Sequence, residues 1–159
     1  MMTMNLKYLL YRHNLETWHV GRRFINAYGP KEGHSKDEQT IAFFAKLDQE
    51  IKNAKLFGHL CCVQLDANAK LGKAVIPNDP HCMLQNGQLL FDVITRNNMV
   101  VCNSLEACDG TITRRRSTVK GLEESIIDYF IICQDLYSFF KFMKIDDKNV
   151  LTRYTKKKN

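Results

Sequence analysis

Residues 59–65, HLCCVQL, form a short continuous apolar run that constrains the fold more than any other feature of the sequence. A run of this kind is typical of a strand that is buried on both of its faces. Residues 125–133, SIIDYFIIC, form a second strong β-run with one carboxylate, Asp128, in its middle. Strands buried on both faces need other elements above and below them. The two runs therefore predict a layered α/β fold.

Two helices are predicted between these strands. The first spans 35–55, where Ser35 can act as the N-cap, Glu38 completes a capping box, and Gly58 ends the helix. Its expected buried stripe follows the helical period and comprises Ile41, Phe44, Leu47, Ile51 and Ala54. The second helix spans 86–98 and presents Leu89, Leu90, Val93 and Ile94. Because helices lie between consecutive strands, at least one face of the sheet is expected to be covered by helices.

Four further strands are predicted from shorter patterns. The first is Phe24–Tyr28, which Gly29 and Pro30 end. The others are residues 99–104, residues 110–116, which lead into a basic loop, and residues 140–145 as a last edge strand.

The composition is that of one ordinary globular domain. The chain has 159 residues, of which 45% are hydrophobic and 25% charged. No apolar segment approaches the ~20 residues of a membrane span, so no membrane association is predicted. The six cysteines lack Cys-x-x-Cys spacing and mostly lie in apolar runs, which favours buried free thiols over zinc ligands or disulfides.

The chain is basic, with a formal net charge of +6. The excess lies mainly in residues 113–120, TRRRSTVK, and in the tail 152–159, TRYTKKKN. A basic balance favours a polyanionic partner such as nucleic acid. Two solvated basic segments without a partner are the simpler alternative.

Asp66 and Asn68 follow the first apolar run, two positions apart. In an extended segment these two side chains point to the same side, so a carboxylate and an amide would face one pocket. A carboxylate can hold a divalent cation or orient a water, and a neutral amide can donate to a phosphate oxygen. The alternative is that both residues cap the turn before Gly72.

Asp128 and Tyr28 add two further candidates. A carboxylate among apolar residues is costly unless it is paired or hydrogen-bonded, so Asp128 either points into solvent from an edge strand or serves a site. Tyr28 ends its strand and can present a hydroxyl to a phosphate, although tyrosine is common in strands. The five histidines show no metal-ligand spacing.

Taken in order, six segments resemble the endonuclease/exonuclease/phosphatase superfamily, and most closely the endonuclease domains of non-LTR retrotransposons. They are INAYGP, the capped helix, VQLDANAKLG, NGQLLFDVITRNNMVVCNS, GTITRRR and SIIDYFI, and the match runs from Phe24 to Lys148. The resemblance implies a DNase I-like two-sheet α/β sandwich. It also implies metal-dependent hydrolysis of phosphodiesters in DNA, with Mg²⁺ as the usual cofactor.

The resemblance also implies roles for individual residues. Tyr28 would contact the scissile phosphate, Asp66 would orient the attacking water, and Asn68 would contact the phosphate. In the family, the aspartate at the position of Asp128 holds a catalytic histidine. Three arginines, Arg114, Arg115 and Arg116, would lie near the DNA backbone and add salt-dependent affinity.

The chain departs from the family pattern at both ends. The family has an Asn-bearing strand and a strand with a metal-binding Glu before the Tyr motif, and Glu16 is not in a matching context. The Ser-Asp-His motif that ends the family domain is absent, so the metal-binding set stays unknown. We therefore expect an unmatched segment 1–20, a partial domain 21–148 that is incomplete at both ends, and a basic tail 149–159.

These departures predict a truncated, retroelement-derived endonuclease-like fragment with little or no activity on its own. Its partners would be DNA and a missing segment of the parent polyprotein, and a retroelement nuclease would act in the nucleus. The alternatives are a non-catalytic nucleic-acid-binding remnant that uses the basic loop and tail, a fragment without molecular function, and a small-molecule phosphatase of the same superfamily.

Overall fold

The computed structural model describes residues 21–31, 37–119 and 121–147. Its main sheet has four strands in the order β1-β2-β7-β3. They are β1 (Arg22–Tyr28), β2 (Leu60–Asp66), β7 (Asp128–Cys133) and β3 (Met99–Val101). The β1 and β2 strands are parallel, whereas β7 runs antiparallel to both of its neighbours.

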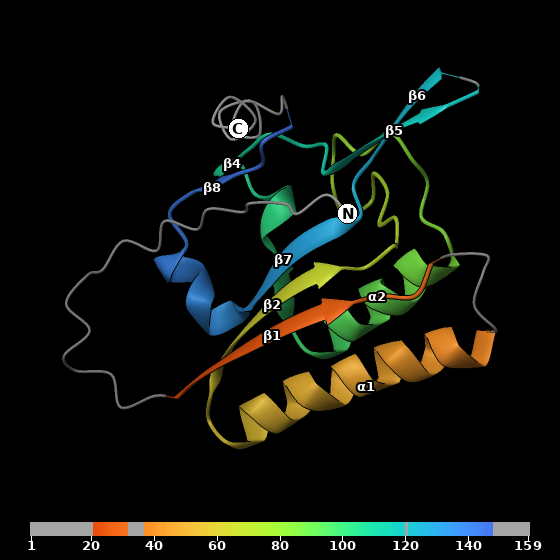
Figure 1. The fold of residues 1–159 in the computed structure, drawn as a ribbon. Coiled ribbons are helices and arrows are strands. Elements are labelled where there is room, and N and C mark those ends of the chain that lie inside the picture. Colours follow the sequence, from red (N-terminus) through yellow and green to blue (C-terminus); the bar gives the residue numbers. More distant parts are fainter. Residues whose placement is uncertain (1–20, 32–36, 120, 148–159) are drawn as a thin grey trace, which may run out of the picture.

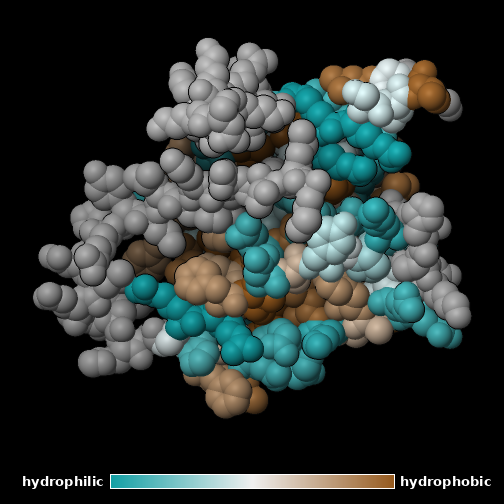
Figure 2. Space-filling view, viewed as in Figure 1, coloured by the Kyte–Doolittle hydropathy of each residue, from teal (hydrophilic) through white to brown (hydrophobic). Residues whose placement is uncertain are grey.

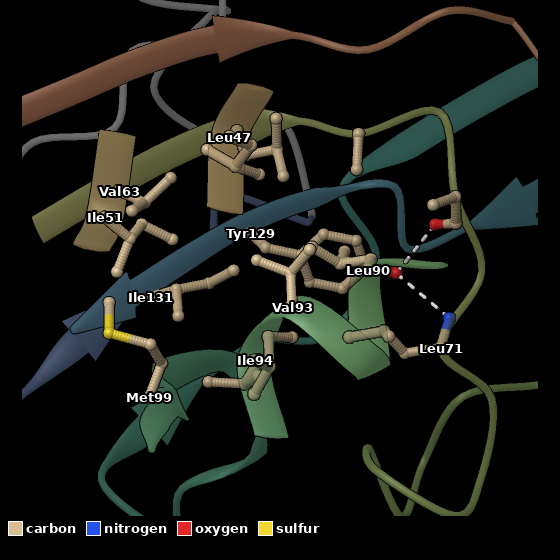
Figure 3. Packing of buried hydrophobic residues seen from close by; sticks show 14 of the residues in the cluster. Leu47, Ile51, Val63, Leu71, Leu90, Val93, Ile94, Met99, Tyr129 and Ile131 are labelled. Atoms are coloured by element: carbon tan, nitrogen blue, oxygen red, sulfur yellow. Dashed lines mark hydrogen bonds between the residues drawn. The ribbon is translucent and has the colours of Figure 1, made fainter. Parts of the chain in front are cut away.

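Two helices, α1 (Asp37–Leu56) and α2 (Gln85–Arg96), cover one face of this sheet (Figure 1). Side chains from both helices and from the inner strands form the larger core (Figure 3). Its members include Phe44, Leu47, Ile51, Val63, Leu65, Leu90, Val93, Tyr129 and Ile131. Burying a side chain of this size contributes about 1.5–3 kcal/mol, so this larger core contributes strongly to stability. The predicted α/β class and the helical cover are confirmed.

Short elements cover part of the opposite face of the sheet. The strands β4 (Cys108–Asp109) and β8 (Met143–Lys144) pair with each other, and the 3-10 helices η1 (Cys102–Ser104) and η2 (Gln134–Phe139) lie beside them. Together with β2 and β7 they enclose a smaller apolar cluster of Cys62, Cys102, Ile132, Met143 and Ile145. The cluster contains residues of β2 and β7 but none of β1, and on this face Phe24 and Tyr28 of β1 are exposed.

The first helix differs from its prediction in one residue of the buried stripe. Ile41 is 52% exposed, and Thr40 is buried instead, four positions before Phe44. The end of the helix is as predicted, because Gly58 has a positive φ of 69° and its N–H bonds to the carbonyl of Lys55. The His59 N–H also bonds to the Ala54 carbonyl, which completes a Schellman motif.

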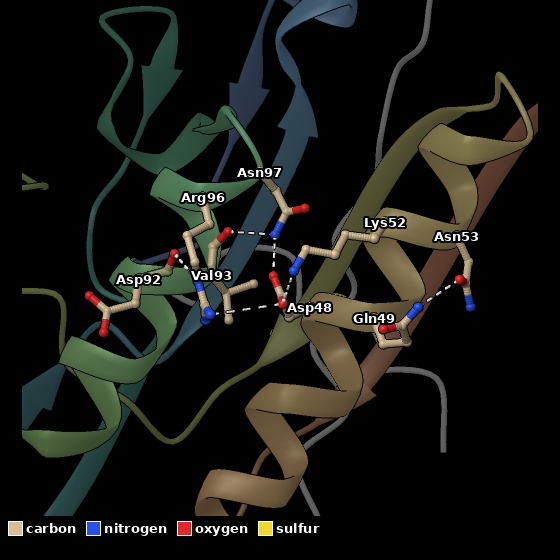
Figure 4. Close-up of polar contacts among 8 residues, drawn as sticks. All are labelled: Asp48, Gln49, Lys52, Asn53, Asp92, Val93, Arg96 and Asn97. Atoms are coloured by element: carbon tan, nitrogen blue, oxygen red, sulfur yellow. Dashed lines mark hydrogen bonds and ion pairs between the residues drawn. The ribbon is translucent and has the colours of Figure 1, made fainter.

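A polar contact joins the two helices (Figure 4). The Asn97 amide donates to Asp48 Oδ1 at 2.5 Å and to the Val93 carbonyl at 2.9 Å. Lys52 Nζ donates to the other oxygen of Asp48 at 2.7 Å, and Arg96 lies 4.0 Å from it. Burial opposes ionisation of Asp48, but these partners outweigh it and hold its pKa below the ordinary value.

Two predicted strands begin later than expected. Residues 110–113 are not a strand, and the basic segment itself forms β5 (Arg114–Thr118), which pairs with β6 (Gly121–Ser125) as a hairpin. Arg114, Arg115 and Arg116 therefore lie in a strand, within the predicted range 110–116, and the chain that follows them pairs back as β6. The last long strand begins at Asp128, so this carboxylate is at the start of β7 and not in its middle.

The other predicted strands are found with shifted bounds. β1 begins two residues before Phe24, β3 ends at Val101, and the last strand is reduced to Met143–Lys144. Ser35, the segment 1–20 and the tail 149–159 lie outside the described residues. No helix in the described part of the chain is long and apolar enough to cross a membrane.

Candidate functional site

The carboxyl ends of β1 and β2 meet the start of β7 at one end of the main sheet (Figure 1). In register, Tyr28 pairs with Asp66 and Asp66 pairs with Asp128. Directly opposed residues of neighbouring strands have side chains on the same face, with Cβ atoms about 4.5–5.5 Å apart. Three of the predicted site residues, which are distant in the sequence, therefore form one row across three strands.

Burial opposes the ionisation of both carboxylates in this row, and the charge of Asp66 also opposes that of Asp128. Burial, and then the negative charge of Asp66, raise the pKa of Asp128 to about 7. Burial likewise raises the pKa of Asp66, against an opposing hydrogen bond from the Asn68 N–H and the charge of Arg114. Neighbouring carboxylates resist ionising together, so this pair attracts a proton or another cation.

Thr113 holds the start of β7 and was missed from the sequence. Its hydroxyl oxygen accepts the N–H groups of Ile127 at 3.0 Å and Asp128 at 3.2 Å. A side-chain hydrogen bond between Thr113 and Asp128 also lowers the pKa of that carboxyl, though less than burial raises it. In the sequence, Thr113 is only a threonine directly before the basic segment. Its contact with Ile127 and Asp128 joins two segments that are 14 and 15 residues apart, and the alternation of residues within one strand gives no sign of such a contact.

Asn103 is a second residue that the sequence did not reveal. Its amide nitrogen donates to the Asp128 carbonyl at 3.0 Å, and its amide oxygen accepts from the Phe130 N–H at 3.0 Å. The side chain thus takes the place of a strand neighbour for β7 where β3 has ended. This contact fixes the backbone on both sides of Tyr129 and with it the direction of Asp128.

Asn68 does not follow the extended geometry that the sequence suggested. Its φ is 44°, so the chain turns there, and the argument that Asp66 and Asn68 point to the same side fails. The Asn68 N–H donates to Asp66 Oδ1 at 3.3 Å, and its amide donates to the Gly29 carbonyl at 2.9 Å. The alternative prediction, in which Asp66 and Asn68 cap a turn, therefore fits the main contacts of Asn68 better. These contacts join the end of β2 to the end of β1.

Gly29 is required at this end of the sheet by close packing. A Cβ atom on Gly29 would lie 2.4 Å from the Ala67 carbonyl oxygen, and the Gly29 N–H donates to the Asp66 carbonyl at 2.7 Å. Only a residue without a side chain allows this approach. The glycine keeps Tyr28 and Asp66 side by side.

The three arginines project from the body of the molecule on the β5–β6 hairpin, where Figure 2 shows polar residues at the base and apolar ones at the tip. Arg114 lies close enough to lower the pKa of both site carboxyls. Arg115 is bound to Glu124 at 2.7 Å, whereas Arg116 is exposed. Two glutamates of β6, Glu123 and Glu124, thus offset much of the positive charge that the sequence alone suggested.

Two neighbouring carboxylates fit a magnesium ion, which is usually held by one or two carboxylates, phosphate oxygens and water. Asp66 and Asp128 are the side chains that would hold it. Within residues 21–31, 37–119 and 121–147, no group of three or more His, Cys, Asp and Glu is placed to hold a metal. Most of the coordination shell would therefore come from water and substrate.

Comparison with solved structures shows a similarity of fold. The chain is similar to the endonuclease domain of TRAS1, a telomere-specific non-LTR retrotransposon, with a TM-score of 0.48 and 14% sequence identity. The similarity covers 70% of this chain and 44% of that one, so the chain spans less than half of the protein it resembles. No protein-family model matches the sequence. No curated protein matches it either.

Proposed function

We propose that this end of the sheet binds a phosphodiester of DNA and is the site of an endonuclease-like, magnesium-dependent hydrolase. The observation that carries the proposal is the row of Tyr28, Asp66 and Asp128 on three adjacent strands. A hydroxyl beside two carboxylates that attract a cation is suited to a phosphate held by a metal. The family resemblance of the sequence supports the same assignment.

Each side chain has a role under this proposal. The Tyr28 hydroxyl donates to a phosphate oxygen, and Tyr28 is exposed enough to reach one. Asp66 orients the attacking water. The Asn68 amide, which already donates one hydrogen to Gly29, has a second for a phosphate oxygen. A bound magnesium ion would supply charge stabilisation on the phosphoryl group.

We expect the isolated chain to be a weak nuclease or an inactive one. Among the described residues, no imidazole contacts the Asp128 carboxylate, and no third acidic side chain joins Asp66 and Asp128 to hold a metal. Removing one member of a catalytic unit commonly costs as much as removing several. A further segment of a parent polyprotein is the partner that would complete such a site.

Nicking of supercoiled plasmid by the purified chain tests the proposal. The reaction contains magnesium, with EDTA in a parallel sample, and compares the wild type with Asp66→Ala and with the exposed control Asp135→Ala. Slow magnesium-dependent nicking that Asp66→Ala abolishes and Asp135→Ala retains supports the assignment. Nicking that survives Asp66→Ala would place the chemistry elsewhere.

A second candidate function, binding of nucleic acid without cleavage, is favoured by the projecting β5–β6 hairpin with its exposed Arg114 and Arg116. Fluorescence anisotropy with a short DNA duplex separates the two. If Asp66→Ala binds DNA as the wild type does and neither protein nicks plasmid, the chain is a binding remnant.

A further inference from the structure

The outer edge of β1 is open among the residues that the structure describes, because β1 pairs with β2 alone. The hydrogen bonds that flank the pair come from odd-numbered residues, Gly21 through its carbonyl and Gly29 through its N–H. Alternate residues of a parallel strand turn both backbone groups to the same neighbour. The even-numbered residues of β1 therefore turn their N–H and C=O groups outward, at Arg22, Phe24, Asn26 and Tyr28.

The centre of this edge has none of the protection that edge strands usually carry. Natural edges are guarded by charges, prolines or bulges. In β1 the charges lie at one end, Arg22 and Arg23, and Pro30 follows the other end. Between them Phe24 and Tyr28 are each 63% exposed, and Asn26 separates the two rings. As far as the described residues show, the uncharged part of the edge can accept another strand.

We propose that β1 is a dimerisation edge, through which two copies of the chain join their main sheets in antiparallel fashion about a two-fold axis at Asn26. In this register Phe24 of each copy lies opposite Tyr28 of the other, and Asn26 faces Asn26. All three of these residues turn their backbone groups outward, so each pair can exchange two hydrogen bonds. Aromatic cross-strand pairs are among the favourable contacts of a sheet.

A second copy fits this edge because the pattern of β1 is its own complement. Two aromatic residues placed symmetrically about Asn26 meet each other only when the partner strand is antiparallel and carries the same spacing. The positive charges also favour this arrangement. Arg22 and Arg23 of the two copies lie at opposite ends of the joined strands, and Arg23 is already bound to Glu50 at 3.0 Å.

The groove beside β1 leaves room for the second strand. It has a volume of about 530 Å³ and lies between β1 and α1, where Phe43, Lys46 and Leu47 form its helix side. Ile25 and Ala27 of the second copy would project toward this side of the sheet. Figure 2 shows apolar side chains, in tan and brown, between polar ones over this part of the molecule.

The mass of the full chain in solution, measured by light scattering after size exclusion, tests the inference. We expect the wild type at twice the 18.5 kDa of one chain. Asn26→Lys puts two like charges opposite each other on the two-fold axis and should weaken the dimer about tenfold or more. Phe24→Lys should act in the same way. The control Leu56→Lys changes an exposed residue at the end of α1 and should remain dimeric.

Hydrogen exchange identifies the edge that is covered, and circular dichroism confirms that each variant is folded. The amides of Phe24, Asn26 and Tyr28 should be protected in the wild type and exchange quickly in either lysine variant. A monomeric wild type overturns the inference, whether these amides exchange quickly or are protected by a segment of the same chain. A dimer that persists in both Asn26→Lys and Phe24→Lys overturns it as well. None of these outcomes depends on nuclease activity.

Discussion

The raised pKa of Asp128 makes the stability of the folded protein depend on pH. The carboxyl of an unfolded aspartate ionises at about pH 3.9, whereas burial and Asp66 raise the pKa of folded Asp128 to about 7. Between these two pH values the folded state binds the proton more tightly. Its contribution to stability is therefore present at low pH and is lost as the pH rises through 7.

Asp128→Asn keeps the shape of the side chain and removes this ionisation. We expect the variant to be more stable than the wild type at pH 8 by about 1–3 kcal/mol, with little difference at pH 4. Urea unfolding in buffer with EDTA measures both values, and the exposed Asp135→Asn is the control. An equal effect at the two pH values would mean that Asp128 ionises normally.

Tyr129, the next residue, supports the loop that follows the site. Its buried hydroxyl lies 2.8 Å from the Ala69 carbonyl and 2.9 Å from the Ile126 carbonyl, and it accepts the Leu71 N–H at 3.3 Å. Tyr129→Phe leaves these backbone groups without the hydroxyl, which should lower the free energy of unfolding by about 1–3 kcal/mol. The same substitution at the exposed Tyr137 is the control and should change stability little.

At the scale of elements, the β5–β6 hairpin offers two arginines in different electrostatic settings. Arg116 is exposed, whereas Arg115 is already bound to Glu124. If the hairpin binds DNA, Arg116→Gln should reduce the slope of log affinity against log salt by about 0.9, since one phosphate contact is lost. Arg115→Gln should change the slope less. Anisotropy titrations at several salt concentrations measure both slopes, and equal slopes in all three proteins would exclude Arg116 from the interface.

The contact between α1 and α2 depends on Asp48. Its replacement by alanine leaves the buried Asn97 amide without one acceptor and removes the partner of Lys52. We expect Asp48→Ala to lower the free energy of unfolding by about 1–3 kcal/mol. Asp92→Ala, on the exposed side of α2, should cost less than Asp48→Ala. Thermal unfolding of the two variants side by side checks the difference.

Helices and strands with a clear hydrophobic period could be predicted from the sequence. Strands whose bounds depend on a pairing partner elsewhere in the chain could not. The periods of α1 and α2 and the apolar run of β2 specify their own structure, because one face or both faces must be buried. Residues 110–116 alternate as a strand would, yet only the part from Arg114 onward finds a partner, in β6. Ile41 fits the helical stripe, but Thr40, one position earlier, is buried in its place.

At the scale of the whole molecule, the candidate site depends on register. Tyr28, Asp66 and Asp128 were each singled out from local context or family resemblance, but nothing local aligns them in a row. That alignment follows from β7 pairing with β2 so that its first residue meets the last residue of β2. Thr113 and Asn103, which act across long sequence separations, were missed for the same reason.

The reactivity of the six cysteines can be used to test whether the main sheet is formed. Cys61, Cys62, Cys102 and Cys133 are buried, as the sequence suggested, whereas Cys108 is half-buried and Cys82 is exposed. Burial raises the pKa of Cys61 and of Cys108 to about 11 and that of Cys62 to about 12, so at neutral pH these thiols form almost no reactive thiolate.

A chromogenic disulfide reagent should therefore label one thiol quickly in the native chain, a second slowly, and four only after denaturation. Cys82→Ser should remove the fast phase and leave the rest unchanged. Quick labelling of four or more thiols would mean that the layers on the two faces of the sheet do not close over β2 and β7. In that case the strand ends of the candidate site would not be held in register, and neither cleavage nor binding at this end of the sheet could follow from the fold.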